Sequence, residues 1–156
     1  MCYNCTNNYV LDIIRKNINY ILNFFEYDLS IMINIKVLNI DEFKKEFKLY
    51  LGFDCDNNTT GFIEDDSNTI IYLDFNDWKY TSHKNESLED FNKVLVHELV
   101  HLVHSNYCDQ KYPSNDIWEG IAYYLANQSY SDYYIKFKVL IDNKSHEEVL
   151  NILKNK

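Results

Sequence analysis

Residues 94–104 read VLVHELVHLVH, an apolar stretch that contains the pattern His97-Glu98-Leu99-Val100-His101. On a helix, residues four positions apart lie on the same face, so His97 and His101 can each offer a ring nitrogen to one Zn²⁺. Glu98 lies about 100° around the helix from His97, where a general base for a zinc-activated water is needed. The pattern therefore predicts a helix that carries a catalytic metal site.

Two simpler explanations compete with a metal site. One is coincidence, but only about 0.01 such matches are expected by chance in a chain of this composition. The other is an ordinary surface helix, on which Lys93, Asp90 and the histidines would form a polar arc. Polar positions elsewhere in this chain are mostly Lys, Asn and Glu, and three of its five histidines fall in this one stretch. The histidines therefore favour the metal site.

Two histidines do not complete a zinc site, so a third ligand must come from elsewhere in the chain. His104 lies about 10.5 Å along the helix axis from His97, too far for both to bind one ion. We expect His104 to support a ligand or to lie on the surface. The metzincin pattern H-E-x-x-H-x-x-G-x-x-H requires Gly at 104 and His at 107, where this chain has His104 and Tyr107. The metzincin arrangement is therefore excluded.

Glu119 is the candidate third ligand. It follows His101 on the next predicted helix, beyond a loop that contains the only proline, Pro113. The two helices can pack antiparallel with both ligand positions near that loop. Asp116 and Glu119 also have capping-box spacing, so the Glu119 carboxylate could instead satisfy a backbone N–H.

The small residues after Glu119 favour the ligand. Gly120 inside a helix costs about 1 kcal/mol relative to alanine, which indicates a compensating close approach of another segment. Ala122 and Ala126 would let this helix approach the histidine helix closely. Routine helix packing explains the alanines but not the Glu-Gly pair.

The length and charge limit the other possibilities. A chain of 156 residues with 46% hydrophobic residues, three Gly and one Pro is expected to form one domain. We expect an α/β part at 1–104, which includes the site helix, and a helical part at 105–156. A net charge of −9 without a basic cluster argues against nucleic acid and anionic membranes as partners.

No signal peptide or apolar run of membrane-spanning length is visible in the sequence, which favours a cytoplasmic location. Cys2 and Cys5 form one C-x-x-C pair without a second pair of similar spacing, so reduced thiols are favoured over structural zinc. We expect a monomer.

Hydrophobic periodicity and turn signals predict an α+β fold. The expected elements are a helix at 8–27, a strand around 33–37, a helix at 41–52 with Asp41 as its cap, two strands within 61–75, a helix from Ser87 through the histidines, and helices from Asp116, at 131–141 and at 145–156. In the second strand of 61–75, Ile71, Leu73 and Phe75 are expected to face the core and Ile70, Tyr72 and Asp74 the other side.

The two motifs together resemble the gluzincin branch of the zinc metallopeptidases, in which H-E-x-x-H on one helix is followed by E-G-x-A-x-Y on the next. The matching residues are His97, Glu98, His101, Glu119, Gly120, Ala122 and Tyr124. The resemblance covers about residues 70–128, and the chain length is similar to that of single-domain minimal gluzincins.

The resemblance implies a zincin-like fold, in which a small mixed sheet of three to four strands packs on the active-site helix and a helical C-terminal subdomain follows. It implies one catalytic Zn²⁺ bound by His97, His101 and Glu119, with Glu98 as the general base. It further implies that a peptide or protein substrate pairs along residues 69–75, acting as an edge strand.

A peptidase of this kind also needs a side chain that stabilises the oxyanion of the transition state. Tyr112 precedes Glu119 by seven residues, a spacing that resembles the lethal-factor-like and Pro-Pro endopeptidase gluzincins. Tyr123, Tyr133 and Tyr134 are alternatives. The G-x-M-E-N motif of aminopeptidases is absent from the sequence, which favours an endopeptidase.

We therefore expect a zinc-dependent endopeptidase that uses a zinc-activated water with Glu98 as general base. Two alternatives stay open. One is a regulatory metalloprotease that cleaves a single cytosolic protein partner. The other is a non-catalytic, zinc-containing domain that binds a peptide along the same strand.

Overall fold

The chain alternates strands and helices before the histidine helix and is helical after it. The computed structural model describes residues 2–108 and 113–154. The elements are β1 (Cys2–Asn4), α1 (Asn8–Phe25), β2 (Met32–Leu38), α2 (Ile40–Leu51), β3 (Gly61–Glu64), the 3-10 helix η1 (Asp65–Ser67), β4 (Thr69–Leu73), the 3-10 helix η2 (Phe75–Tyr80), α3 (Leu88–Tyr107), α4 (Asn115–Leu125), α5 (Asp132–Ile141) and α6 (His146–Leu153). No helix among them is long and apolar enough to cross a membrane.

Local caps explain where the helices begin and end. Ser87 and Asp90 form the predicted capping box at the start of α3. The N-cap of α2 is Asn39 rather than the predicted Asp41, because the Asn39 side chain accepts the N–H groups of Asp41 and Glu42 in the first helical turn. Gly52 ends α2 with φ at 83°, a left-handed conformation that favours glycine.

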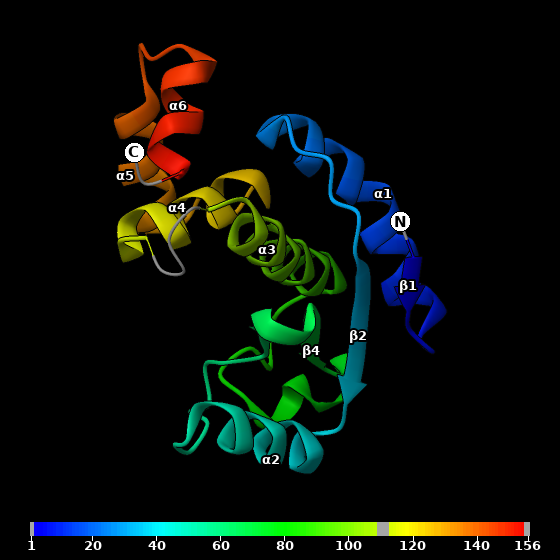
Figure 1. The fold of residues 1–156 in the computed structure, drawn as a ribbon. Helices are drawn as coiled ribbons and strands as arrows, with labels where there is room; N and C mark the ends of the chain where they lie inside the picture. The colour runs from blue at the N-terminus through cyan, green and yellow to red at the C-terminus, as the bar shows by residue number, and fades with distance from the viewer. Residues whose placement is uncertain (1, 109–112, 155–156) are drawn as a thin grey trace.

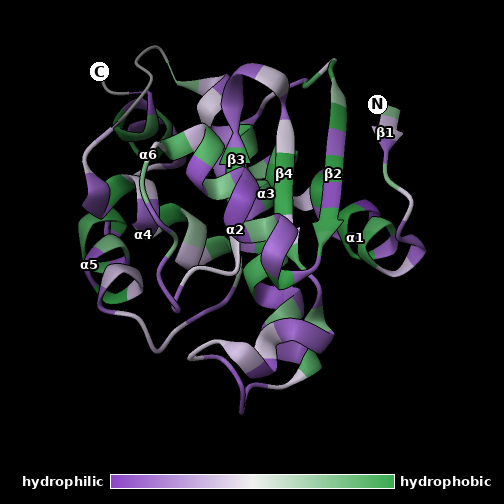
Figure 2. Ribbon diagram, turned by 90° about the horizontal axis from the view of Figure 1, so that it is seen from below, coloured by the Kyte–Doolittle hydropathy of each residue, from purple (hydrophilic) through white to green (hydrophobic). Residues whose placement is uncertain are grey.

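Four strands form one mixed sheet in the order β1-β2-β4-β3. β1, β2 and β4 run parallel, and β3 pairs antiparallel with β4. Figure 2 shows the strands side by side in this order, with α4, α5 and α6 beyond the β3 edge. The predicted α+β class with a small mixed sheet is confirmed.

The prediction that residues 69–75 form an edge strand is wrong. After β2 the chain passes through α2 and then forms β3 and β4. β4 pairs parallel with β2, and β3 pairs antiparallel with the other side of β4. β4 is therefore central in the sheet, and β3, at 61–64, holds the edge next to α3.

Helices cover both faces of the sheet. α2 packs against β2 and β4 on one face, and α3 packs against β3 and β4 on the other, with α1 beside α3 (Figure 1). Every residue of β4 is buried, including Ile70 and Tyr72 on the face that the sequence pattern assigned away from the core. A strand that helices cover on both faces has no solvent side, so alternation along it separates two parts of the core.

Candidate metal centre

His97 and His101 of α3 and Glu119 of α4 bring their polar atoms together. The Nε2 atoms of the two histidines lie 2.9 Å apart. The carboxylate oxygens of Glu119 lie 3.3 Å from His97 Nε2 and 3.6 Å from His101 Nε2. Both imidazoles are buried, whereas the Glu119 side chain is 30% exposed. The three predicted ligands, His97, His101 and Glu119, thus form one group that could hold a metal ion, called the metal group below.

The spacing and chemistry of this group fit Zn²⁺. Ligand atoms about 2.1 Å from a tetrahedral zinc ion lie about 3.4 Å from one another, close to the distances within this group. Two imidazole nitrogens and one carboxylate are also the donor set of zinc sites that keep a fourth position open. Two Nε2 lone pairs that face each other repel unless a proton or a cation lies between them, so the buried pair suits an ion.

Contacts on two sides hold His97. Its Nδ1–H donates to Oε1 of Gln128 at 2.9 Å, and the ring of Tyr123 meets it edge to face with centroids 4.6 Å apart. The hydrogen bond at Nδ1 leaves Nε2 to face Glu119. Burial lowers the pKa of His97, but the hydrogen bond and charge of Glu119 and the charge of Glu98 raise it by more. The pKa of His97 therefore lies above its ordinary value.

The indole of Trp118 supports His101 and His104. It stacks on His101 with centroids 4.5 Å apart and on His104 with centroids 5.1 Å apart. Burial and the neighbouring His97 lower the pKa of His101 to about 4, so the ring is neutral, as a metal ligand must be. Its Nδ1 has no hydrogen-bond partner among the described residues.

His104 is fully buried and does not belong to the metal group, so the surface alternative for this residue is wrong. Its Nε2–H donates to the carbonyl of Leu153 at 3.0 Å, which ties α3 to the end of α6. Burial lowers the pKa of His104 to about 4, so this ring also stays neutral. His104 therefore has a structural role in the packing of α6.

Glu119 does not cap α4. Ser114 precedes the helix without a side-chain capping bond, and Asp116 lies inside the first turn, 3.2 Å from Lys136. The capping-box alternative is therefore wrong. Although burial raises the pKa of Glu119, hydrogen bonds with His101 and His97 hold it well below the usual range, so the carboxylate is ionised.

Gly120 makes the close contact that a glycine inside a helix indicates, but with a different neighbour. A Cβ at Gly120 would lie 2.6 Å from Cβ of Phe137 on α5. The glycine therefore lets α5, rather than α3, pack tightly against α4. Ala122 and Ala126, the other small residues of this stretch, are buried.

Glu98 lies in the same cleft as the metal group, with only 8% of its surface exposed. Burial raises its pKa to about 7; Glu119 raises it further and His97 opposes the change. A carboxyl with a pKa near neutrality can accept and return a proton at physiological pH. Gly61 of β3 permits this placement, because a Cβ there would lie 2.8 Å from Cγ of Glu98.

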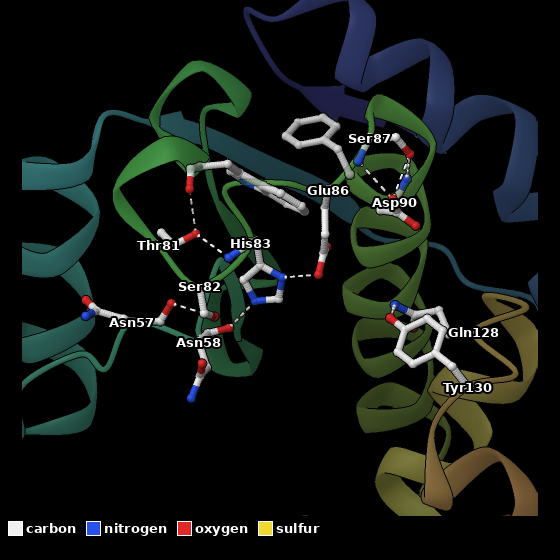
Figure 3. A network of polar contacts seen from close by, with 12 residues as sticks. Asn57, Asn58, Thr81, Ser82, His83, Glu86, Ser87, Asp90, Gln128 and Tyr130 are labelled. Atoms are coloured by element: carbon white, nitrogen blue, oxygen red, sulfur yellow. Dashed lines mark hydrogen bonds and ion pairs between the residues drawn. The ribbon is translucent and has the colours of Figure 1, made fainter.

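The metal group opens into a cleft of about 400 Å³ between the β3 edge and the turn after α4. The residues that line it beside the group include Tyr50, Leu51, Asn58, Gly61, Phe62, Ile63, His83, Tyr123, Gln128 and Tyr130. Figure 3 shows His83 and Asn58 on the sheet side of α3 and Gln128 and Tyr130 on the opposite side. The His83 ring lies 2.8 Å from Glu86 and 2.7 Å from the Asn58 carbonyl. These two contacts hold together the loops at the rim of the cleft.

Of the candidate oxyanion residues, only Tyr123 lines the cleft within the described part of the chain. Tyr112 lies outside the described residues. Tyr133 stacks on Tyr123, with centroids 6.0 Å apart, and Tyr134 packs against Tyr124. Neither of these two tyrosines lines the cleft, so Tyr112 and Tyr123 remain the candidates.

Comparison with known proteins gives no match: no protein-family model, no curated protein and no solved structure is significantly similar to this chain.

Proposed function

We propose that the protein is a zinc-dependent endopeptidase with a zincin-like fold, similar to the gluzincins. The meeting of His97, His101 and Glu119 in one group carries the proposal, because buried Glu98 lies in the same open cleft. The small mixed sheet packed on α3, with helices α4 to α6 after it, is consistent with a zincin-like arrangement.

Zinc held by these three ligands would supply a Lewis acid that lowers the pKa of water and polarises a scissile carbonyl. The role we assign to Glu98 is to take a proton from the attacking water and deliver it to the leaving amine. Its carboxyl suits both steps by its position, because it lies in the same cleft as the three proposed ligands.

The edge of β3 is the place where an extended peptide would bind. The Leu73 N–H donates to the Thr60 carbonyl at 2.8 Å, which makes the adjacent Gly61–Tyr72 pair a non-hydrogen-bonded pair of the antiparallel ladder. The N–H and C=O of Gly61 therefore point away from β4, toward the free edge. A peptide paired here would pass Glu98, which lies against Gly61.

The wall of the cleft beyond β3 is apolar. Tyr50 stacks on Phe62 with centroids 6.2 Å apart, and Leu51 at the end of α2 is 41% exposed beside them. Side chains of an extended peptide alternate between two sides. Those that point away from Glu98 would meet this wall, so we expect a preference for large apolar side chains there.

Elemental analysis of the purified protein and two variants tests the metal site. We expect one zinc per chain in the wild type and in Asp116→Asn, which changes an exposed carboxylate on the same helix. Glu119→Ala should hold little zinc, because two histidines alone bind the ion weakly. Equal zinc in all three proteins would remove Glu119 from the site.

Peptide cleavage by Glu98→Gln tests the chemistry. This variant should retain zinc and lose hydrolysis, whereas Glu89→Gln, an exposed change on the same helix, should cut peptides like the wild type. Cleavage by Glu98→Gln at the wild-type rate would contradict the mechanism. Tight zinc binding without hydrolysis of any peptide in a broad library would instead support a non-catalytic peptide-binding domain.

A further inference from the structure

Gln128 is a buried polar side chain that the proposed chemistry does not use. Only 3% of it is exposed. Its Oε1 accepts the hydrogen bond from His97 Nδ1 at 2.9 Å, and its Nε2 donates to the Tyr130 hydroxyl at 3.2 Å. Tyr130 lines the cleft and is exposed, and Figure 3 shows it beside Gln128.

The end of α4 fixes the Gln128 backbone. The Asn127 N–H bonds the carbonyl of Tyr124, and the Gln128 N–H bonds the carbonyl of Tyr123. Asn127 is left-handed, with φ at 55°. Together these bonds form a Schellman motif, the standard ending of a helix at a left-handed residue. The Ser131 N–H then donates to the Gln128 carbonyl, so both backbone groups of Gln128 are held.

This arrangement decides which nitrogen of His97 faces the metal group. The amide oxygen only accepts hydrogen bonds, so His97 carries a proton on Nδ1, and in the neutral ring Nε2 then holds the lone pair that a metal ion binds. Ligating histidines commonly use such a partner to fix the tautomer and the ring orientation. His101 has no comparable bond at Nδ1 among the described residues and relies on stacking with Trp118.

We propose that Gln128 is the positioning residue of the metal site, which holds His97 in the tautomer and orientation that bind zinc. This inference rests on the proposed zinc site. The amide is neutral, so it orients the imidazole without adding a further negative charge beside Glu98 and Glu119. Its other hydrogen bond links this position to Tyr130, a residue that a bound substrate would contact.

Chelator competition measures the zinc affinity of the full chain and three variants. Gln128→Leu keeps the approximate size but removes the acceptor, and we expect its zinc affinity to fall by about 10- to 100-fold. Gln128→Glu keeps an acceptor for His97 and should bind zinc at least as tightly as the wild type. Ser129→Ala, at an exposed neighbour on the same turn, should not change affinity. A Gln128→Leu affinity within twofold of the wild type would overturn the proposal.

Ring ¹H–¹⁵N spectra of the metal-free protein separate this proposal from the zinc site itself. At a pH above the pKa of His97, where the ring is neutral, His97 of the wild type should be protonated at Nδ1, and Gln128→Leu should show a mixture of tautomers in a chain that is still folded. Unchanged spectra in the variant would contradict the positioning role. If the wild type bound no zinc, the proposed function would fail, while the spectra would still decide whether Gln128 positions His97.

Discussion

Replacing Gly61 with alanine tests the packing that places Glu98. A Cβ at Gly61 would lie 2.8 Å from Cγ of Glu98 and 2.8 Å from the Tyr72 ring, where ordinary contacts are 3.4–4 Å. Tyr72 cannot yield easily, because its ring is fully buried and its hydroxyl donates to the Phe91 carbonyl at 2.6 Å. β3 or Glu98 must therefore move. Such overpacking costs about 1–3 kcal/mol, and the smaller backbone entropy of unfolded alanine offsets about 0.4–1 kcal/mol.

The expected net loss in the free energy of unfolding of Gly61→Ala is thus about 1–2 kcal/mol. Urea unfolding should show it as a lower midpoint at unchanged slope, and the melting temperature should fall by about 2–8 °C. Zinc content should stay at one per chain, because the nearest atoms belong to Glu98 and Tyr72 and not to a ligand.

Peptide hydrolysis by Gly61→Ala should fall by about tenfold to a hundredfold if Glu98 is displaced. Gly52→Asn is the control, because no atom lies within 4 Å of a Cβ there and asparagine tolerates its left-handed conformation. A Gly61→Ala protein as stable and as active as the wild type would refute the packing that we describe around Glu98.

Three further changes have definite expected outcomes. The pKa of His104 is about 4 in the folded protein, below its ordinary value. Unfolded chains therefore protonate at a higher pH than folded ones, which favours unfolding as the pH falls. In urea unfolding, the wild type should lose about 2 kcal/mol more stability than His104→Gln between pH 7 and pH 5. Gly120→Ala should lower the free energy of unfolding by about 1–3 kcal/mol despite better helix propensity, because its Cβ would overlap Phe137. Leu51→Asp should raise the KM for peptides with large apolar side chains and leave zinc content unchanged, and an unchanged KM would place the substrate elsewhere.

Local physics explains why the metal group could be predicted from the sequence. Helical periodicity puts His97 and His101 on one face whatever surrounds them, and their burial follows from the apolar residues between and beside them. Glu119 lies on another helix, so helical spacing alone could not predict it. The Glu-Gly pair after a short loop was the additional signal for this residue. The structure brings these three side chains together.

The position of the edge strand beside α3 could not be predicted in the same way. Periodicity identifies 61–64 and 69–73 as strands, but the two segments carry no signal for which one pairs with β2. That choice depends on the α2 crossover and on packing against both faces of the sheet. The same limit applies to Gly120, whose close contact was predictable from its cost in a helix while its neighbour, Phe137, was not.

His104 and Gln128 show the same limit for polar residues. The distance along the helix axis excludes His104 as a ligand of the same ion. Its burial, however, depends on α6, which packs against it through the Leu153 carbonyl. Gln128 had only the helix-ending Asn127 before it as a signal, and nothing local connects it to His97.

The sequence by itself determined the helices, the caps at Ser87 and Gly52 and the placing of His97 and His101 on one helix face, because these depend on interactions between residues a few positions apart. Only the tertiary structure decided that β3 is the edge beside Glu98, that Gly61 makes room for this carboxyl and that Gln128 orients His97. These relations depend on strand order and helix docking, which are settled by burial summed over the whole chain rather than by any single segment.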